Sequence, residues 1–140
     1  MRAELICDGL HVHPSVVRLA FALFGADRMV MISDSLRCCG MPDGDYILGE
    51  QPVHLSGGVA RLPDGTIAGS ASNLFMCLKK AISFGVAQED AIRAATYNPA
   101  RAVGAENIVG SISNGKFADF LVCDDNYNLR EVRLGGESIK

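Results

Sequence analysis

Two ionisable side chains, Asp34 and His11, are the strongest candidates for chemistry in this sequence. Asp34 directly follows the apolar run 29–32, so we expect it at the exit of a buried strand. Partial burial or a nearby metal ion would suit a carboxylate there to accept and return a proton. His11 follows the apolar run 3–7, where an imidazole can polarise a carbonyl group or bind phosphate. The alternative for Asp34 is an ordinary role in a turn or helix cap.

Two further histidines extend the set of possible metal ligands. His13 stands two residues after His11, and on a strand the two rings would share one face. His54 is the remaining histidine. A zinc site needs at least three protein ligands, so a metal site formed within this chain alone is not expected. The adjacent Cys38 and Cys39 lack a second pair, so no metal or redox site is predicted there either.

The segment 65–70, with the sequence Gly-Thr-Ile-Ala-Gly-Ser, is a third candidate. It exposes backbone amides next to a predicted helix start, and such amides can line a pocket for a small molecule. The alternative is the end of a hairpin before a helix cap. Both interpretations place the segment beside the beginning of a helix.

A strand–helix–strand unit is predicted to position the histidine and the aspartate. The apolar run 29–32 is continuous rather than alternating, which is typical of a parallel strand covered on both faces, and residues 3–7 are mostly apolar as well. Residues 14–24 are apolar at helical spacing, and Gly25 is well placed to end that helix. Because chemistry in α/β folds gathers at the carboxyl ends of the strands, we expect both side chains at that edge.

The rest of the chain predicts a small β-meander, three helices and a β tail. Strands are expected at 46–48, 52–55, 59–62 and 66–68, and later at 118–123 and 129–134. Helices are expected at 73–84 with Ser72 as the cap, at 88–96, and at 98–103 with Asn98 as the cap. We divide the chain into 1–104, which contains a meander at about 45–69, and a β part at 105–140.

The composition places the chain in the globular class and disfavours two kinds of partner. The 140 residues carry a formal net charge of −3, which offers no electrostatic footprint for nucleic acid. The sequence contains no stretch with the length of a membrane span and no signal-peptide pattern, so no membrane association is expected. Five cysteines without CxxC spacing predict reduced thiols and a cytoplasmic location.

Two buried parallel strands and a short β tail are too few to close a barrel or cover a sheet. Their open edges would favour aggregation if nothing paired with them. We therefore expect this sequence to be part of a larger fold.

Several motifs resemble the C-terminal part of the N-acetylglucosamine-6-phosphate deacetylases, which belong to the amidohydrolase superfamily. The more specific motifs are segment 8–14, the strand ending in Ser33-Asp34, and segment 64–70. Segments 94–102, 110–112 and 115–119 match patterns shared across the superfamily. Together these motifs cover nearly the whole chain.

The resemblance implies a partial α/β fold, made of the last βα units of a TIM barrel and the C-terminal strands of a small β-sandwich. Asp34 matches the family's catalytic aspartate, which takes a proton from a metal-bound water and gives it to the leaving amine. His11 matches a histidine that contacts the substrate and supports the amide carbonyl in the transition state. Ile67, Ala68 and Gly69 match a loop that contacts the substrate.

The same resemblance implies deacetylation of a small amino-sugar phosphate, N-acetylglucosamine 6-phosphate, to glucosamine 6-phosphate and acetate in amino-sugar catabolism. A divalent metal ion (zinc, iron or manganese) would supply the nucleophile and a Lewis acid. The family's metal ligands and phosphate-binding arginine have no counterpart here, so we predict no metal ligand in this chain. The complete site is expected to need a missing N-terminal part or homo-oligomerisation.

Two alternatives to this activity remain open. One is an amidohydrolase that acts on a different amide, because the motifs of the C-terminal region are shared across the superfamily. The other is an inactive remnant that binds sugar phosphate or pairs with another chain through its open strand edges.

Overall fold

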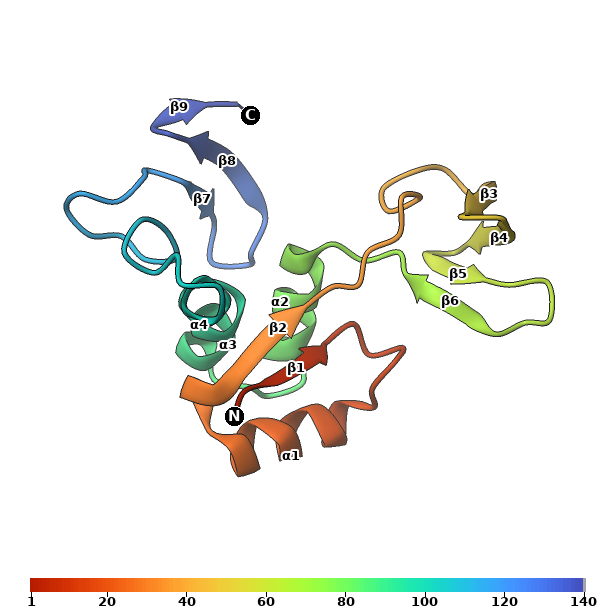
Figure 1. Ribbon diagram of the computed structural model, residues 1–140, viewed down its shortest axis with the longest axis horizontal. Helices are drawn as coiled ribbons and strands as arrows, with labels where there is room; N and C mark the ends of the chain where they lie inside the picture. The colour runs from red at the N-terminus through yellow and green to blue at the C-terminus, as the bar shows by residue number, and fades with distance from the viewer. Residues whose placement is uncertain (140) are drawn as a thin grey trace.

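The computed structural model describes residues 1–139, which form helices and three separate sheets (Figure 1). The helices are α1 (Pro14–Phe24), α2 (Leu74–Ser83), α3 (Gln88–Ala95), α4 (Tyr97–Ala102) and the short 3₁₀ helix η1 (Ala26–Arg28). The strands are β1 (Ala3–Ile6), β2 (Met29–Ile32), β3 (Gly44–Leu48), β4 (Gln51–Ser56), β5 (Val59–Arg61), β6 (Ile67–Ser70), β7 (Phe120–Cys123), β8 (Leu129–Leu134) and β9 (Glu137–Ser138). The predicted α/β class is confirmed.

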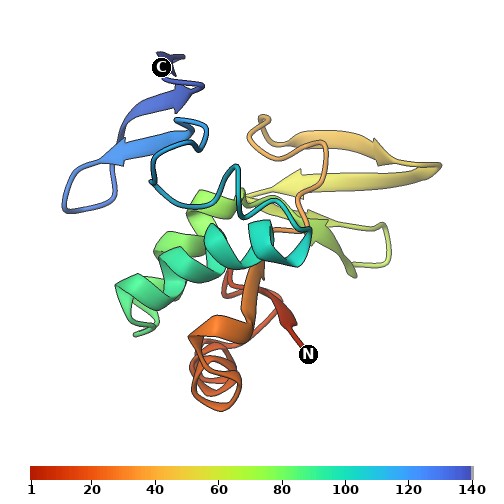
Figure 2. The ribbon, with the colours of Figure 1, turned by 60° about the vertical axis from the view of Figure 1, so that its left-hand side comes forward.

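Strands β1 and β2 form the predicted parallel pair, with α1 as the crossover between them. Their register runs from Ala3 opposite Met29 to Ile6 opposite Ile32. Helix α1 covers one face of the pair, and α2, α3 and α4 cover the other (Figure 2). The three residues Met29–Met31 are at most 4% exposed, which explains why β2 is apolar without alternation.

One hydrophobic core joins the strand pair to its helices. Its buried members come from β2, from helices α1, α2 and α3, and from the residues that follow β1 and α2: Cys7, Val17, Phe21, Met29, Met31, Cys77, Ala81, Val86, Ala91 and Ala94. The small residues of α2 and α3 allow these helices to approach the strands closely. None of the described helices is long and apolar enough to cross a membrane.

The predicted cap of α2 is wrong by one residue. Asn73, rather than Ser72, caps the helix and accepts a hydrogen bond from the backbone N–H of Met76 at 2.8 Å. Both residue types are good caps, so sequence preference does not separate them. The backbone N–H of Ser72 instead donates to Ser70 Oγ at 3.0 Å.

Asn98 is also not the cap that we predicted, because α4 begins at Tyr97 and Asn98 lies inside it. Asn98 is fully buried. Its side-chain Nδ2 donates hydrogen bonds to the backbone carbonyls of Ala26 at 2.6 Å and Met29 at 2.7 Å. A single amide group therefore ties α4 to the turn that starts β2.

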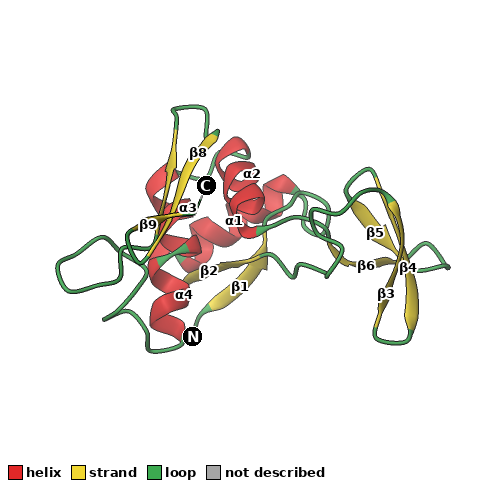
Figure 3. Cartoon of the chain, turned by 90° about the horizontal axis from the view of Figure 1, so that it is seen from above, coloured by secondary structure: helices red, strands yellow, loops and turns green. Residues whose placement is uncertain are grey.

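Strands β3 to β6 form the predicted meander as an antiparallel sheet in sequence order. The meander stands apart from the helices and has a small core of its own (Figure 3). The buried residues of this second core are Cys38, Val53, Leu55 and Ala60. The end of β6 runs back to the strand pair, where Ser35 and Ser70 form a parallel bridge.

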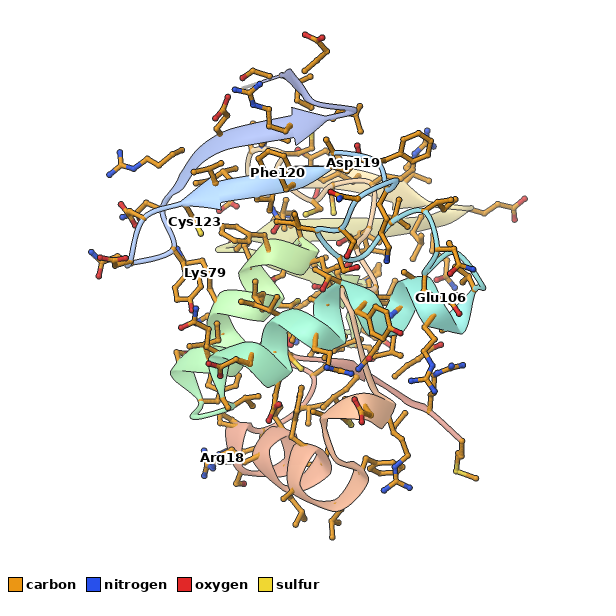
Figure 4. All side chains as sticks on the ribbon, turned by 90° about the vertical axis from the view of Figure 1, so that its left-hand side faces the viewer. Arg18, Lys79, Glu106, Asp119, Phe120 and Cys123 are labelled. Carbon is orange, nitrogen blue, oxygen red and sulfur yellow. The ribbon has the colours of Figure 1, made fainter. Side chains whose placement is uncertain are left out.

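The C-terminal sheet contains β7, β8 and β9 in that order. Strand β7 begins at Phe120, two residues later than predicted, and β9, which follows Gly135 and Gly136, was not predicted. Phe120 and Cys123 mark β7 at the end of the molecule opposite Arg18 of α1 (Figure 4). All four residues of β7 are exposed, which is unusual for so apolar a strand.

We expect Asn98→Ala to destabilise the chain by about 2–4 kcal/mol, because the variant leaves two backbone carbonyls without their donor. Urea unfolding followed by circular dichroism measures the change. Asn107→Ala is the matched control, since Asn107 is exposed, and it should change the free energy of unfolding by less than about 0.5 kcal/mol. Equal effects of the two variants would contradict the role of Asn98.

Candidate active site

Asp34 follows β2 in a turn that its backbone holds in an uncommon conformation. Its φ is 49°, a region that residues other than glycine seldom adopt. The backbone of Ser70 stabilises this turn on both sides: its N–H donates to the carbonyl of Asp34 at 3.1 Å, and its carbonyl accepts from the N–H of Leu36 at 2.8 Å. The turn therefore depends on the end of β6.

The Asp34 side chain is exposed. The reason is local, because the last buried residue of β2 is Met31 and the chain has left the core by the time it reaches Asp34. Within residues 1–139 the carboxylate forms no hydrogen bond or ion pair. Such a carboxylate is accessible and free to take or give a proton.

His11 lies in the loop after β1 and pairs with Asp8. Its Nδ1 is 2.8 Å from Asp8 Oδ2, and the exposed fractions of the two side chains are 20% and 4%. The other carboxylate oxygen, Asp8 Oδ1, accepts from the backbone N–H groups of Leu10 at 2.9 Å and His11 at 3.0 Å. The buried aspartate therefore fixes both the loop and the imidazole ring.

The pKa of Asp8 is lowered although its burial acts in the opposite direction. Burial alone would raise the pKa, because it penalises the charged form. The N–H groups of His11 and Leu10 and the His11 ring stabilise the carboxylate by more than this penalty. Asp8 is therefore an ionised, hydrogen-bonded partner of His11.

The other two histidines lie apart from this pair. His13 does not share a strand face with His11, because the chain has left β1; its Nδ1 instead accepts from the N–H of Ser15 and caps α1. His54 lies on β4 and pairs with the exposed Asp45 at 2.7 Å. The HxH spacing is therefore explained by helix capping and not by a shared ligand.

The described residues do not fit a metal site by themselves. Within residues 1–139, the His, Cys, Asp and Glu side chains form no cluster of three or more that could hold an ion. The five cysteines are free, and Cys38 is buried in the core of the meander. Burial raises the pKa of Cys7 to about 12, with Cys77 and Asp8 adding to the shift, so this thiol stays protonated.

Ile67, Ala68 and Gly69 belong to β6, which ends beside the Asp34 turn. Ile67 and Ala68 are half-buried, whereas Gly69 is buried. The segment leads from the last strand of the meander to the cap of α2 at Asn73. One of its backbone N–H groups, that of Ser70, is already bonded to the carbonyl of Asp34.

Gly69 is required by a close approach of two segments. Its φ is 151°, and a Cβ atom added there would lie 2.9 Å from Cδ2 and 3.0 Å from Cγ of Leu36. This contact brings β6 against the chain that follows Asp34. A larger residue would push the two segments apart.

Two residues of the site, Asp8 and Ser70, were not singled out from the sequence. Ser70 is fully buried, and its Oγ lies 3.5 Å from Asp8 Oδ2 while its backbone bonds to Asp34 and Leu36. The role of Asp8 could have been predicted from sequence, because an aspartate at the start of a turn commonly accepts hydrogen bonds from backbone N–H groups two or three residues later. Ser70 was included only as the last residue of segment 65–70, since its hydrogen-bond partners are distant in sequence.

Comparisons with known proteins identify the family to which this chain belongs. The amidohydrolase family pattern matches residues 25–138. A provisionally named N-acetylgalactosamine-6-phosphate deacetylase of Escherichia coli K12 is 34% identical over 135 residues, which are 96% of this chain and 80% of that protein. The N-acetylglucosamine-6-phosphate deacetylase of Vibrio furnissii is 34% identical over 97% of this chain but only 34% of its own length.

Solved structures show the same partial overlap. A variant of the N-acetyl-D-glucosamine-6-phosphate deacetylase of Mycobacterium smegmatis, solved in complex with N-acetyl-D-glucosamine-6-phosphate, is 33% identical. Its fold matches 99% of this chain with a TM-score of 0.90, and the match covers 37% of that protein. The chain thus spans about a third of the length of the Vibrio and Mycobacterium proteins.

We expect the Asp8 hydrogen bonds to stabilise the chain at neutral pH and to be lost on acidification. Because folding lowers the pKa of Asp8, its contribution is complete above the ordinary aspartate value of about 3.9 and disappears as the pH falls through the lower folded value. Asp8→Asn should therefore destabilise the chain by about 1–3 kcal/mol at pH 7 and by less near pH 3. Urea unfolding at both pH values measures this difference.

The matched control for Asp8 is Asp45→Asn, which alters an aspartate–histidine pair of similar length whose side chains are 63% and 88% exposed. Exposed pairs contribute little, so we expect a change of less than about 0.5 kcal/mol. A destabilisation by Asp8→Asn that is the same at both pH values would argue against an ionised Asp8.

We expect Gly69→Ala to destabilise the chain by about 1–3 kcal/mol through the contact with Leu36. Gly44→Ala is the control, because Gly44 has a similar φ of 159° but its Cβ would meet nothing within 4 Å. The midpoint of chemical unfolding is measured for each variant. If Gly44→Ala destabilises the chain as much as Gly69→Ala does, the effect is explained by backbone conformation and not by the close approach to Leu36.

Proposed function

Because the chain belongs to the amidohydrolase family, we propose that it contributes the proton-transferring and substrate-contacting part of an N-acetylhexosamine 6-phosphate deacetylase site. The observation that carries the proposal is the free carboxylate of Asp34, held in a strained turn at the carboxyl end of a buried parallel strand. Strain of this kind is typical of functional sites. Similarity to deacetylases along nearly the whole chain supports the substrate class.

Each site residue has one task in the proposed hydrolysis. A water oxygen forms a bond to the acetyl carbonyl carbon, and Asp34 accepts the proton that this water loses. The carbon–nitrogen bond then breaks, and Asp34 returns the proton to the amine, which leaves the amino sugar and acetate. His11 hydrogen-bonds the carbonyl oxygen as negative charge develops on it. Ile67, Ala68 and Gly69 contact the sugar phosphate.

The family implies a divalent metal ion, for which zinc, iron and manganese are the candidates. When bound, such an ion activates water and polarises a carbonyl group. Since residues 1–139 do not fit a metal site by themselves, we propose that the metal ligands come from other protein segments.

The same segments would complete the fold. We propose that β1 and β2 are neighbouring strands of a TIM barrel to which residues 1–104 belong, and that residues 105–140 are strands of a small β-sandwich. The support is that a two-stranded parallel sheet and the exposed strand β7 both have unpaired edges. The partner is either the remainder of a longer chain or a second copy, in a cytoplasmic setting.

The substrate has two candidates that differ in one hydroxyl group. N-acetylglucosamine 6-phosphate is named for the Vibrio and Mycobacterium proteins, and N-acetylgalactosamine 6-phosphate for the Escherichia coli protein, of which this chain spans 80%. We favour the glucosamine compound, because the motifs of segments 8–14 and 64–70 resemble that group. Both compounds belong in the assay.

A chimeric enzyme that contains this chain tests the proposal directly. In the Vibrio furnissii deacetylase, the matched 137-residue segment is replaced by this chain, and acetate release from both substrates is measured. Asp34→Asn in the chimera should lower kcat by about 10²–10⁴-fold with little change in KM, because the amide cannot transfer the proton. Asp45→Asn should leave kcat unchanged, since this exposed aspartate lies on the meander.

Two outcomes would contradict the proposal. A folded chimera that releases no acetate would argue for the remnant alternative, and Asp34→Asn with full activity would remove the assigned role. The 140-residue chain alone, supplied with zinc, manganese or ferrous ion, is expected to release no acetate. If it does so in an Asp34-dependent way, the proposal that other segments supply the metal ligands is wrong.

A further inference from the structure

Three of the four hydrogen bonds to the Asp8 carboxylate within residues 1–139 come from the loop that carries His11. Oδ1 accepts the backbone N–H groups of Leu10 and His11, and Oδ2 accepts from the His11 ring at 2.8 Å and from Ser70 Oγ at 3.5 Å. The side chain is only 4% exposed, so water does not compete for these acceptors. The ring orientation of His11 is therefore set from within the protein.

An ionised carboxylate can only accept hydrogen bonds, so Nδ1 of His11 must be the nitrogen that carries the proton. In residues 1–139, Nε2 of His11 forms no hydrogen bond. Nε2 is therefore the ring nitrogen left to meet a substrate. For Nε2 to donate to a carbonyl oxygen as well, the ring must hold a proton on both nitrogens, and Asp8 provides the counter-charge for that form.

We propose that Asp8 is the positioning residue of this site, which holds the His11 ring with the proton on Nδ1 and leaves Nε2 for the substrate. The proposal rests on the proposed function for the identity of that substrate. Asp8 itself does not touch the reacting atoms. Its effect reaches them through His11, in the way that a buried carboxylate orients histidines in other active sites.

Ser70 connects this pair to Asp34. Its Oγ reaches Asp8 Oδ2, its N–H donates to the Asp34 carbonyl and its carbonyl accepts from Leu36. Since Ser70 is fully buried, these bonds fix the Asp34 turn relative to the carboxylate that orients His11. The positions of the two proposed reacting groups are thus coupled through one serine.

The test is the protonation state of the histidine ring nitrogens in the isotope-labelled 140-residue chain, measured by proton–nitrogen correlation NMR. At a pH well above the ordinary histidine pKa of about 6.5, the neutral His11 ring should favour the form protonated on Nδ1 by about tenfold or more. Asp8→Asn should reverse this preference, because the asparagine Nδ2 donates to Nδ1 and leaves the proton on Nε2. A merely structural role would not invert the tautomer.

Asp45→Asn is the control, and it should alter the His54 signals while leaving those of His11 unchanged. If His11 in the unaltered chain carries its proton on Nε2, the proposal is overturned. This measurement needs no variant, so it decides the question even if Asp8→Asn folds poorly. An unchanged His11 tautomer in a folded Asp8→Asn also overturns it.

Activity separates this proposal from the proposed function. In the chimera described above, Asp8→Asn should lower kcat by about 10–100-fold and change KM less, as expected for a lost outer partner of a reacting group. If the tautomer is as expected but neither substrate is cleaved, Asp8 positions His11 and the deacetylase function is wrong. If the activity depends on Asp34 but does not change in Asp8→Asn, the positioning role of Asp8 is overturned and the proposed function stands.

Discussion

The parallel pairing of β1 with β2 is the constraint on which the rest of this structure depends. It aligns the carboxyl ends of two strands that α1 separates in sequence, so that the loops carrying His11 and Asp34 begin at the same edge. The pairing is stabilised by burial on both faces, with α1 on one side and α2 to α4 on the other. Asn98 adds a polar link from α4 to the entry of β2, and this link fixes where the strand starts.

The site is assembled by backbone contacts as much as by side chains. The end of β6 bonds to the Asp34 turn, and Ser70 carries that connection to Asp8 and so to His11. A positive φ at Asp34 is tolerated because Ser70 holds the chain on both sides of it. Residues from three distant parts of the chain are in this way held in one arrangement.

The strand–helix–strand unit could be predicted from sequence because continuous apolar runs and a helical spacing leave little choice of period. The meander was also predictable from its glycine-rich turns. The cap of α2 at Asn73 and the buried position of Asn98 inside α4 were not, since adjacent polar residues offer equal capping chemistry and tertiary contacts make the choice. The exposure of Asp34 and the roles of Asp8 and Ser70 depend on partners distant in sequence or on turn geometry, which spacing alone does not reveal.

The separate core of the meander has a consequence for how such a protein can diversify. Ile67, Ala68 and Gly69 are carried by a sheet whose own buried residues are independent of those beneath β1 and β2. The outer hairpin of β3 and β4 can therefore change in length or composition while Ser70 and Gly69 keep the inner end anchored. The meander can therefore be exchanged or redesigned as a unit while the scaffold that holds the aspartate is left unchanged.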